Sequence, residues 1–131
     1  MAPRITVVNH NAEFLELLRD ILNDEHYVTT CIDADIEDEV ARIVESRPDL
    51  LIIDLRVESD GHHGWDIAQE IRREPALDGL PVIISSGDIL ALESLAEDLA
   101  GVQRVQTLAK PFAITELTAA IDQLLAEAAA G

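Results

Sequence analysis

Short apolar runs alternate with helical stripes along the whole chain, and this alternation constrains the fold more than any other feature. Five runs are predicted to be strands: Ile5–Val8, Tyr27–Ile32, Leu50–Ile53, Val82–Ile84 and Val105–Leu108. The central runs are continuously apolar, which is typical of parallel strands that are covered on both faces. Because a helix follows each strand, we expect an α/β fold: a doubly wound, five-stranded parallel sheet with five helices in three layers.

Apolar residues at helical spacing mark the five helices. The stripes are Phe14, Leu18, Ile21 and Leu22; Ile36, Val40, Ile43 and Val44; Ile67, Ala68 and Ile71; Leu92, Leu95 and Leu99; and Leu117, Ile121, Leu124 and Leu125. Asn11 and Asp88 precede the first and the fourth stripe, and we expect each to cap its helix. The length of 131 residues predicts a single domain, 1–131, because single domains cluster near 100–150 residues.

Charge and cysteine content exclude several classes of function. The chain has 26 acidic and 9 basic residues, a net charge of −17, so it offers no basic surface for nucleic acid or for an anionic membrane. Its one cysteine, Cys31, cannot form an internal disulfide, and the first apolar run is too short for a signal peptide or a membrane span. We therefore expect a soluble cytoplasmic protein that binds neither nucleic acid nor membrane.

Polar side chains follow the third, fourth and fifth apolar runs, where a doubly wound sheet places its ligands. They are Asp54, Ser86 and Lys110, the only lysine of the chain. A carboxylate can accept a phosphoryl group, and a hydroxyl and a cation can hold the charge of the transferred group. A turn aspartate and a surface lysine are the ordinary alternatives for the residues taken singly. Together the three favour phosphoryl chemistry. We expect that the protein is not an enzyme, because the sequence has no recognisable nucleophile–base pair apart from Asp54.

Four segments of the chain resemble a response-regulator receiver domain of the CheY-like kind. They are ITVVNHNAEFLELLRDIL, RPDLLIIDL, EPALDGLPVIISSG and LAKPF, the last being the lysine–proline signature. The resemblance implies the strand order 2-1-3-4-5 and a place in two-component phosphorelay signalling. It further implies that a histidine kinase or a phosphotransfer protein phosphorylates Asp54, with Ser86 as the switch hydroxyl and Lys110 as the phosphate-binding lysine.

The sequence departs from the family where the family binds a metal. Receiver domains usually end their first strand with two acidic residues that hold Mg²⁺ together with the acceptor aspartate, whereas this chain has Asn9 and His10. Mg²⁺ prefers carboxylate oxygens and water to an imidazole nitrogen or a lone amide. Only Asp54 remains of the three expected carboxylates, so we expect a weak Mg²⁺ site.

The histidines of the chain leave open a second kind of metal site. His62 and His63 are expected on the same side of the sheet as His10, and such a cluster could hold Zn²⁺ or another transition metal. The ordinary alternative is that these histidines are solvated. Trp65, which follows them, is expected to pack over the loop that carries them.

Two functions therefore stay open. Thr107 stands where the family has an aromatic switch residue, and a threonine has no ring to move between a buried and an exposed position. This favours the alternative of a degenerate receiver that binds proteins independently of phosphorylation. In either case the output passes to a downstream protein partner. The kinase, that partner and the oligomeric state, a homodimer included, are not fixed by the sequence.

Overall fold

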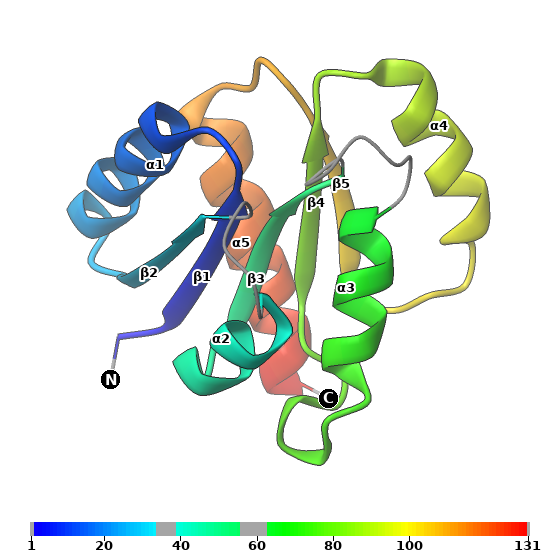
Figure 1. The fold of residues 1–131 in the computed structure, drawn as a ribbon, viewed down its shortest axis with the longest axis horizontal. Coiled ribbons are helices and arrows are strands. Elements are labelled where there is room, and N and C mark those ends of the chain that lie inside the picture. The colour runs from blue at the N-terminus through cyan, green and yellow to red at the C-terminus, as the bar shows by residue number, and fades with distance from the viewer. Residues whose placement is uncertain (1, 34–38, 56–62, 131) are drawn as a thin grey trace.

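The computed structural model describes residues 2–33, 39–55 and 63–130, and it confirms the doubly wound parallel sheet (Figure 1). The strands are β1 (Arg4–Asn9), β2 (Val28–Asp33), β3 (Leu50–Asp54), β4 (Val82–Ser86) and β5 (Val105–Ala109). All neighbouring strands pair in parallel, in the order β2-β1-β3-β4-β5. The second strand begins one residue later than predicted, so Tyr27 lies just outside it.

Helices cover both faces of the sheet. They are α1 (Ala12–Asp24), α2 (Glu39–Ser46), α3 (His63–Arg72), α4 (Ile89–Asp98) and α5 (Ile114–Ala130), with a short 3-10 helix, η1 (Pro75–Leu77), before β4. Residues of α1 and α5 pack on one face, and residues of α2, α3 and α4 pack on the other (Figure 1). The sequence did not predict η1, and Ile36 of the predicted second stripe lies outside the described residues.

Each face of the sheet has its own apolar core. On the α1–α5 face, alternate strand residues such as Val7, Ile52 and Ile83 join Leu18 and Ile121 in one cluster. The intervening strand residues belong to the cluster on the opposite face. After Arg4, every residue of β1, β3 and β4 is buried, as the central strands of a sheet that is covered on both faces require. Polar residues at the carboxyl ends of these strands are therefore buried too, which sets the conditions for the site.

Both predicted helix caps are confirmed. The Oδ1 of Asn11 accepts a hydrogen bond of 3.2 Å from the N–H of Phe14 at the start of α1. The Oδ1 of Asp88 accepts one of 3.0 Å from the N–H of Ala91 at the start of α4. Each cap satisfies an N–H group that has no partner within its helix. Since both helices start just after a strand end, the caps also fix the loops at the carboxyl edge of the sheet.

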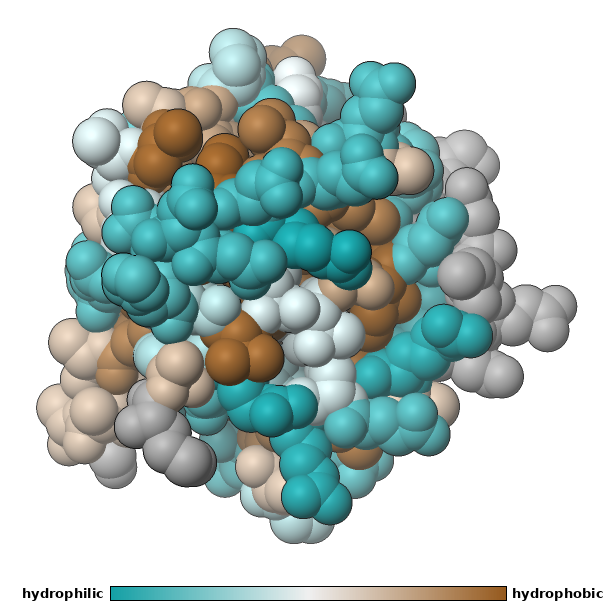
Figure 2. Space-filling model, turned by 90° about the vertical axis from the view of Figure 1, so that its left-hand side faces the viewer, coloured by the Kyte–Doolittle hydropathy of each residue, from teal (hydrophilic) through white to brown (hydrophobic). Residues whose placement is uncertain are grey.

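Figure 2 shows hydrophilic side chains over most of one face, with hydrophobic residues in separate small patches. No helix within residues 2–33, 39–55 and 63–130 is long and apolar enough to cross a membrane.

The single cysteine and the single tryptophan are both at least partly buried. Cys31 is half-buried and its Sγ donates to the Leu15 carbonyl at 3.5 Å. Burial raises the pKa of its thiol. Trp65 is buried in the core on the α3 side, while the loop before it lies outside the described residues.

A close backbone approach joins α3 to the end of β3, and it supplies a test of the fold. The N–H of Gly64 donates to the Leu55 carbonyl at 2.9 Å, and a Cβ on Gly64 would overlap the backbone carbonyl of Asp54. We expect Gly64→Ala to lower the free energy of unfolding by about 2 kcal/mol, because backbone atoms cannot move aside as a flexible side chain can. Urea denaturation measures this loss.

Gly87→Ala is the matched control for this prediction. A Cβ on Gly87 would meet no atom within 4 Å, although this glycine also lies at the carboxyl edge of the sheet. The free energy of unfolding of Gly87→Ala should stay within about 0.5 kcal/mol of that of the parent chain. Equal denaturation midpoints for the two variants would contradict the close approach at Gly64.

Candidate functional site

Asp54 lies at the centre of the carboxyl edge of the sheet. It is the last residue of β3, the strand between β1 and β4, and its side chain is only 8% exposed. A carboxylate this deeply buried requires partners, because an uncompensated buried charge is costly. The partners that the structure supplies define what the site can do.

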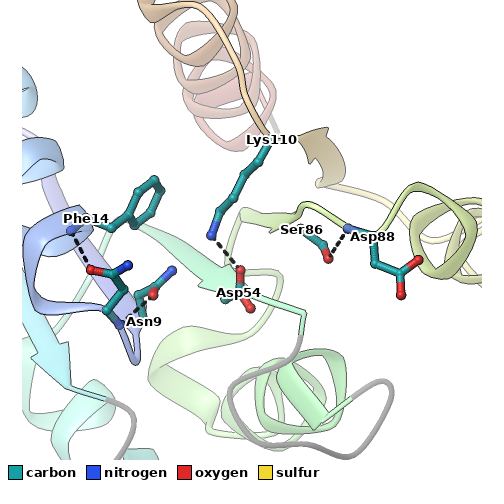
Figure 3. Close-up of polar contacts among 7 residues, drawn as sticks. Asn9, Phe14, Asp54, Ser86, Asp88 and Lys110 are labelled. Atoms are coloured by element: carbon teal, nitrogen blue, oxygen red, sulfur yellow. Dashed lines mark hydrogen bonds and ion pairs between the residues drawn. The ribbon is translucent and has the colours of Figure 1, made fainter.

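Lys110 supplies the positive charge at Asp54. Its Nζ donates to the Oδ1 of Asp54 at 2.8 Å (Figure 3). The backbone N–H of Lys110 donates to the Ser86 carbonyl at 2.9 Å, which fastens the loop after β5 to the end of β4. The lysine side chain is 26% exposed, so it is partly buried. An ion pair in this position is screened less by water than an exposed pair.

An aromatic pair supports the lysine from the α1 side, and sequence reasoning missed it. The Nζ of Lys110 lies 4.2 Å from the centroid of the Phe14 ring, in the geometry of a cation–π contact. The rings of Phe14 and Phe112 meet edge to face, with centroids 6.2 Å apart and an interplanar angle of 80°. The sequence placed Phe14 only in an apolar stripe. No local pattern in the sequence indicates its contact with the lysine, which joins α1 to the loop after β5.

Ser86 completes the set of three predicted side chains at this edge. Its Oγ accepts a hydrogen bond of 3.0 Å from the N–H of Asp88 (Figure 3). A hydroxyl that accepts in this way still has its own proton to donate. The structure thus brings Asp54, Ser86 and Lys110 to one edge of the sheet, on β3, on β4 and directly after β5. Their roles in phosphoryl chemistry stay a prediction.

Asn9 is buried and its amide is used within its own loop. Asn9 is 1% exposed, and its Oδ1 accepts a hydrogen bond of 2.8 Å from the N–H of Asn11. His10, the next residue, is exposed. The two residues that replace the family's acidic pair therefore differ in burial, and the one side-chain oxygen that they offer, the Oδ1 of Asn9, already accepts a hydrogen bond.

The donors that the described residues supply here fit Mg²⁺ poorly. The ion takes six oxygen ligands in near-octahedral geometry, usually with at least one or two carboxylates. Here the Oδ1 of Asp54 is held by Lys110, and the Oδ1 of Asn9 is held by a backbone N–H. Within the described ranges, no group of three or more His, Cys, Asp or Glu side chains could hold a metal ion.

Two further predictions concern residues next to this site. His62 and the side chain of His63 lie outside the described residues, so a transition-metal site that combines them with His10 stays a prediction. Thr107 lies half-buried in β5, two residues before the end of the strand. It offers a methyl group and a hydroxyl where the family has a ring.

Known proteins share both the fold and the sequence pattern. The family model of the response regulator receiver domain matches residues 5–122. No curated protein matches the chain. Among solved structures, a putative response regulator from Chloroflexus aurantiacus is 26% identical with a TM-score of 0.76, and the match covers 96% of this chain and 99% of that one.

Two structures with lower sequence identity also share the fold. The chemotaxis protein CheY4 of Vibrio cholerae is 15% identical with a TM-score of 0.79, covering 95% of this chain and 99% of that one. The receiver domain of a sensor histidine kinase from Pseudomonas aeruginosa is 23% identical with a TM-score of 0.74, covering 96% and 99%. That structure has a magnesium ion coordinated in its active site cleft.

Restoring the acidic pair tests this account of the metal site. The parent chain should respond little to millimolar Mg²⁺, whereas Asn9→Asp combined with His10→Asp should give a saturable response. Three clustered carboxylates repel, so at least one pKa rises in the folded variant, and its stability falls as the pH rises from acid to neutral. Mg²⁺ should recover that stability because it binds the folded state. Thermal melts and Trp65 fluorescence, with and without Mg²⁺, measure both effects.

Asp54→Asn in the double variant is the control, and it should abolish the Mg²⁺ response. Tight Mg²⁺ binding by the parent chain would contradict the prediction of a weak Mg²⁺ site. A double variant whose stability and fluorescence do not respond to Mg²⁺ would show that Asn9 and His10 are not the cause of the weak Mg²⁺ site.

Proposed function

This chain belongs to the response regulator receiver domain family, and we propose that it accepts a phosphoryl group on Asp54. The observation that carries the proposal is the 2.8 Å contact between the Nζ of Lys110 and the Oδ1 of this carboxylate. The donor would be a histidine kinase or a phosphotransfer protein, and the signal would pass to a downstream protein partner. On this proposal the domain is a cytoplasmic signalling module and not an enzyme.

The chemistry needs a nucleophile and a way to hold charge. A carboxylate oxygen of Asp54 forms a bond to phosphorus, while the bond from phosphorus to the nitrogen of the donor's phosphohistidine breaks. The electron pair of that bond stays with the imidazole, which then takes up a proton. The transferred group spreads its negative charge over three oxygens. Lys110 can neutralise part of this charge, and the Ser86 hydroxyl can donate to one of these oxygens.

Mg²⁺ contributes little to this proposed reaction. Near Asp54, the Oδ1 of this carboxylate accepts from Lys110, and the Oδ1 of Asn9 accepts from a backbone N–H. The replacement of two acidic residues by Asn9 and His10 also removes two negative charges from the family's pattern. One divalent cation would neutralise the same amount of charge. The acceptor site therefore depends less on a metal ion for charge neutralisation.

A second candidate function is binding to a protein partner without phosphorylation. The engaged amide of Asn9 and the half-buried Thr107 favour it, because neither supplies the metal ligand or the mobile ring of the usual receiver. In that case the Asp54–Lys110 pair is structural. The two candidates differ in one measurable respect, which is whether Asp54 becomes covalently modified.

Intact-mass measurement after incubation with a small phosphodonor tests the first candidate. We expect one added phosphoryl group on the parent chain and none on Asp54→Asn. The adduct should be labile to hydroxylamine, since an acyl phosphate is a reactive anhydride. An unmodified parent chain at saturating donor would favour the second candidate, and an adduct that persists on Asp54→Asn would place the acceptor elsewhere.

Lys110→Ala tests the role of the cation. We expect the rate of phosphoryl acceptance to fall by at least about tenfold, because removal of one charge-stabilising group commonly costs that much or more. The free energy of unfolding should fall by about 1–3 kcal/mol, because the variant leaves the buried carboxylate of Asp54 without this cation, although Lys110 itself is partly exposed.

Arg19→Ala is the matched control, because it removes the same charge from an exposed position on α1. It should leave both the rate of acceptance and the stability nearly unchanged. A Lys110→Ala variant that loses several kcal/mol of stability but accepts normally would show that the lysine serves the fold.

A further inference from the structure

The ammonium group of Lys110 lies between a carboxylate and an aromatic ring. Its Nζ is 2.8 Å from the Oδ1 of Asp54 and 4.2 Å from the centroid of the Phe14 ring (Figure 3). A lysine side chain is flexible, and a single ion pair fixes only its charged end. The ring supplies a second contact, from a different element of the fold, and so restricts where the ammonium group can lie.

The ring of Phe14 is itself held in place. The backbone N–H of Phe14 donates to the capping oxygen of Asn11 at 3.2 Å, which sets the residue in the first turn of α1. Its ring meets that of Phe112 edge to face, and both rings pack against the core on the α1–α5 face. Phe14 is therefore a fixed support for the lysine and not a mobile surface group.

An aromatic ring has an advantage over an acidic side chain in this position. The negative face of the ring attracts an ammonium group, but the ring carries no net charge. A carboxylate there would repel an incoming phosphoryl group and would compete with it for the lysine. The cation–π contact is also weak enough for the lysine to follow the charge as it moves onto the phosphoryl oxygens.

We propose that Phe14 is a positioning residue for phosphoryl acceptance, because its ring holds Lys110 at the carboxylate of Asp54. This proposal rests on the proposed function, and it adds a residue that acts through the lysine without contacting the phosphoryl group. The plain alternative is that Phe14 only fills space. It also lines an apolar hollow of about 500 Å³ together with Leu17, Phe112 and Ile114.

The only lysine of the chain makes the contact directly observable. Protein grown with ¹³C-labelled lysine gives the side-chain signals of Lys110 alone. Protons over the face of a ring resonate upfield, so we expect the ε-CH₂ signal to move downfield in Phe14→Leu and to stay nearly in place in Phe14→Tyr. Leu17→Ala, an exposed residue of the same helix, is the control and should not move it. An unchanged signal in Phe14→Leu would overturn the proposal.

The rate of acceptance from a small phosphodonor tests the functional consequence. Loss of a partly desolvated cation–π contact predicts a rate about 3- to 10-fold lower in Phe14→Leu. Phe14→Tyr, which keeps the ring, should restore the rate to within about twofold, and Leu17→Ala should leave it unchanged. A Phe14→Leu variant with a shifted lysine signal and a normal rate would overturn the positioning role.

A double-mutant cycle separates positioning from packing. If Phe14 acts through the lysine, Phe14→Leu should cost nothing further in the Lys110→Ala background. An equal loss of rate in both backgrounds would show that the ring supports only the fold, and the proposal would be wrong. A parent chain that accepts no phosphoryl group would instead contradict the proposed function, while the lysine signal would still decide whether Phe14 holds Lys110.

Discussion

The ion pair between Lys110 and Asp54 is the interaction on which the geometry of this edge depends. The two residues are 56 positions apart, and the lysine reaches across β4 to the end of β3. This reach requires the parallel order β3-β4-β5 and the backbone bond from Lys110 to the Ser86 carbonyl. Because β3 is buried along its whole length, the carboxylate has little water to solvate it. The cation that compensates it must therefore come from the protein or from a ligand.

The charges of the residues at this site also determine how strongly it attracts Mg²⁺. A site with three carboxylates and one lysine is strongly anionic and attracts a divalent cation. With Asn9 and His10 in place of two acidic residues, one carboxylate faces one lysine at 2.8 Å. Such a pair is nearly neutral, so the electrostatic attraction for Mg²⁺ is weaker even before ligand geometry is considered. The Oδ1 of Asn9 also accepts a hydrogen bond from the N–H of Asn11, so this neutral oxygen helps to hold the loop.

The fold was predictable from the sequence because its strands and helices are marked by strong local patterns. Continuous apolar runs located β1, β3 and β4, and the residues at their carboxyl ends followed from the topology. The 3-10 helix η1 was missed because its one turn, led by Pro75, is too short for any apolar period. The contact between Phe14 and Lys110 was missed for a different reason. Helical spacing already explained Phe14 as a core residue, and no local pattern reveals a contact between α1 and the loop after β5.

One short loop accounts for both unusual properties of the site. After β1, the N–H of Asn11 donates to the Oδ1 of Asn9, and the Oδ1 of Asn11 accepts from the N–H of Phe14. The first bond engages the amide that could have served as a metal ligand. The second starts α1 at the point that brings the Phe14 ring over Lys110. A weak metal site and an aromatic support for the lysine are thus both linked to the same short segment, residues 9–11. An aspartate at position 9 could accept the same N–H, so the loop would survive while the charge at the site changed.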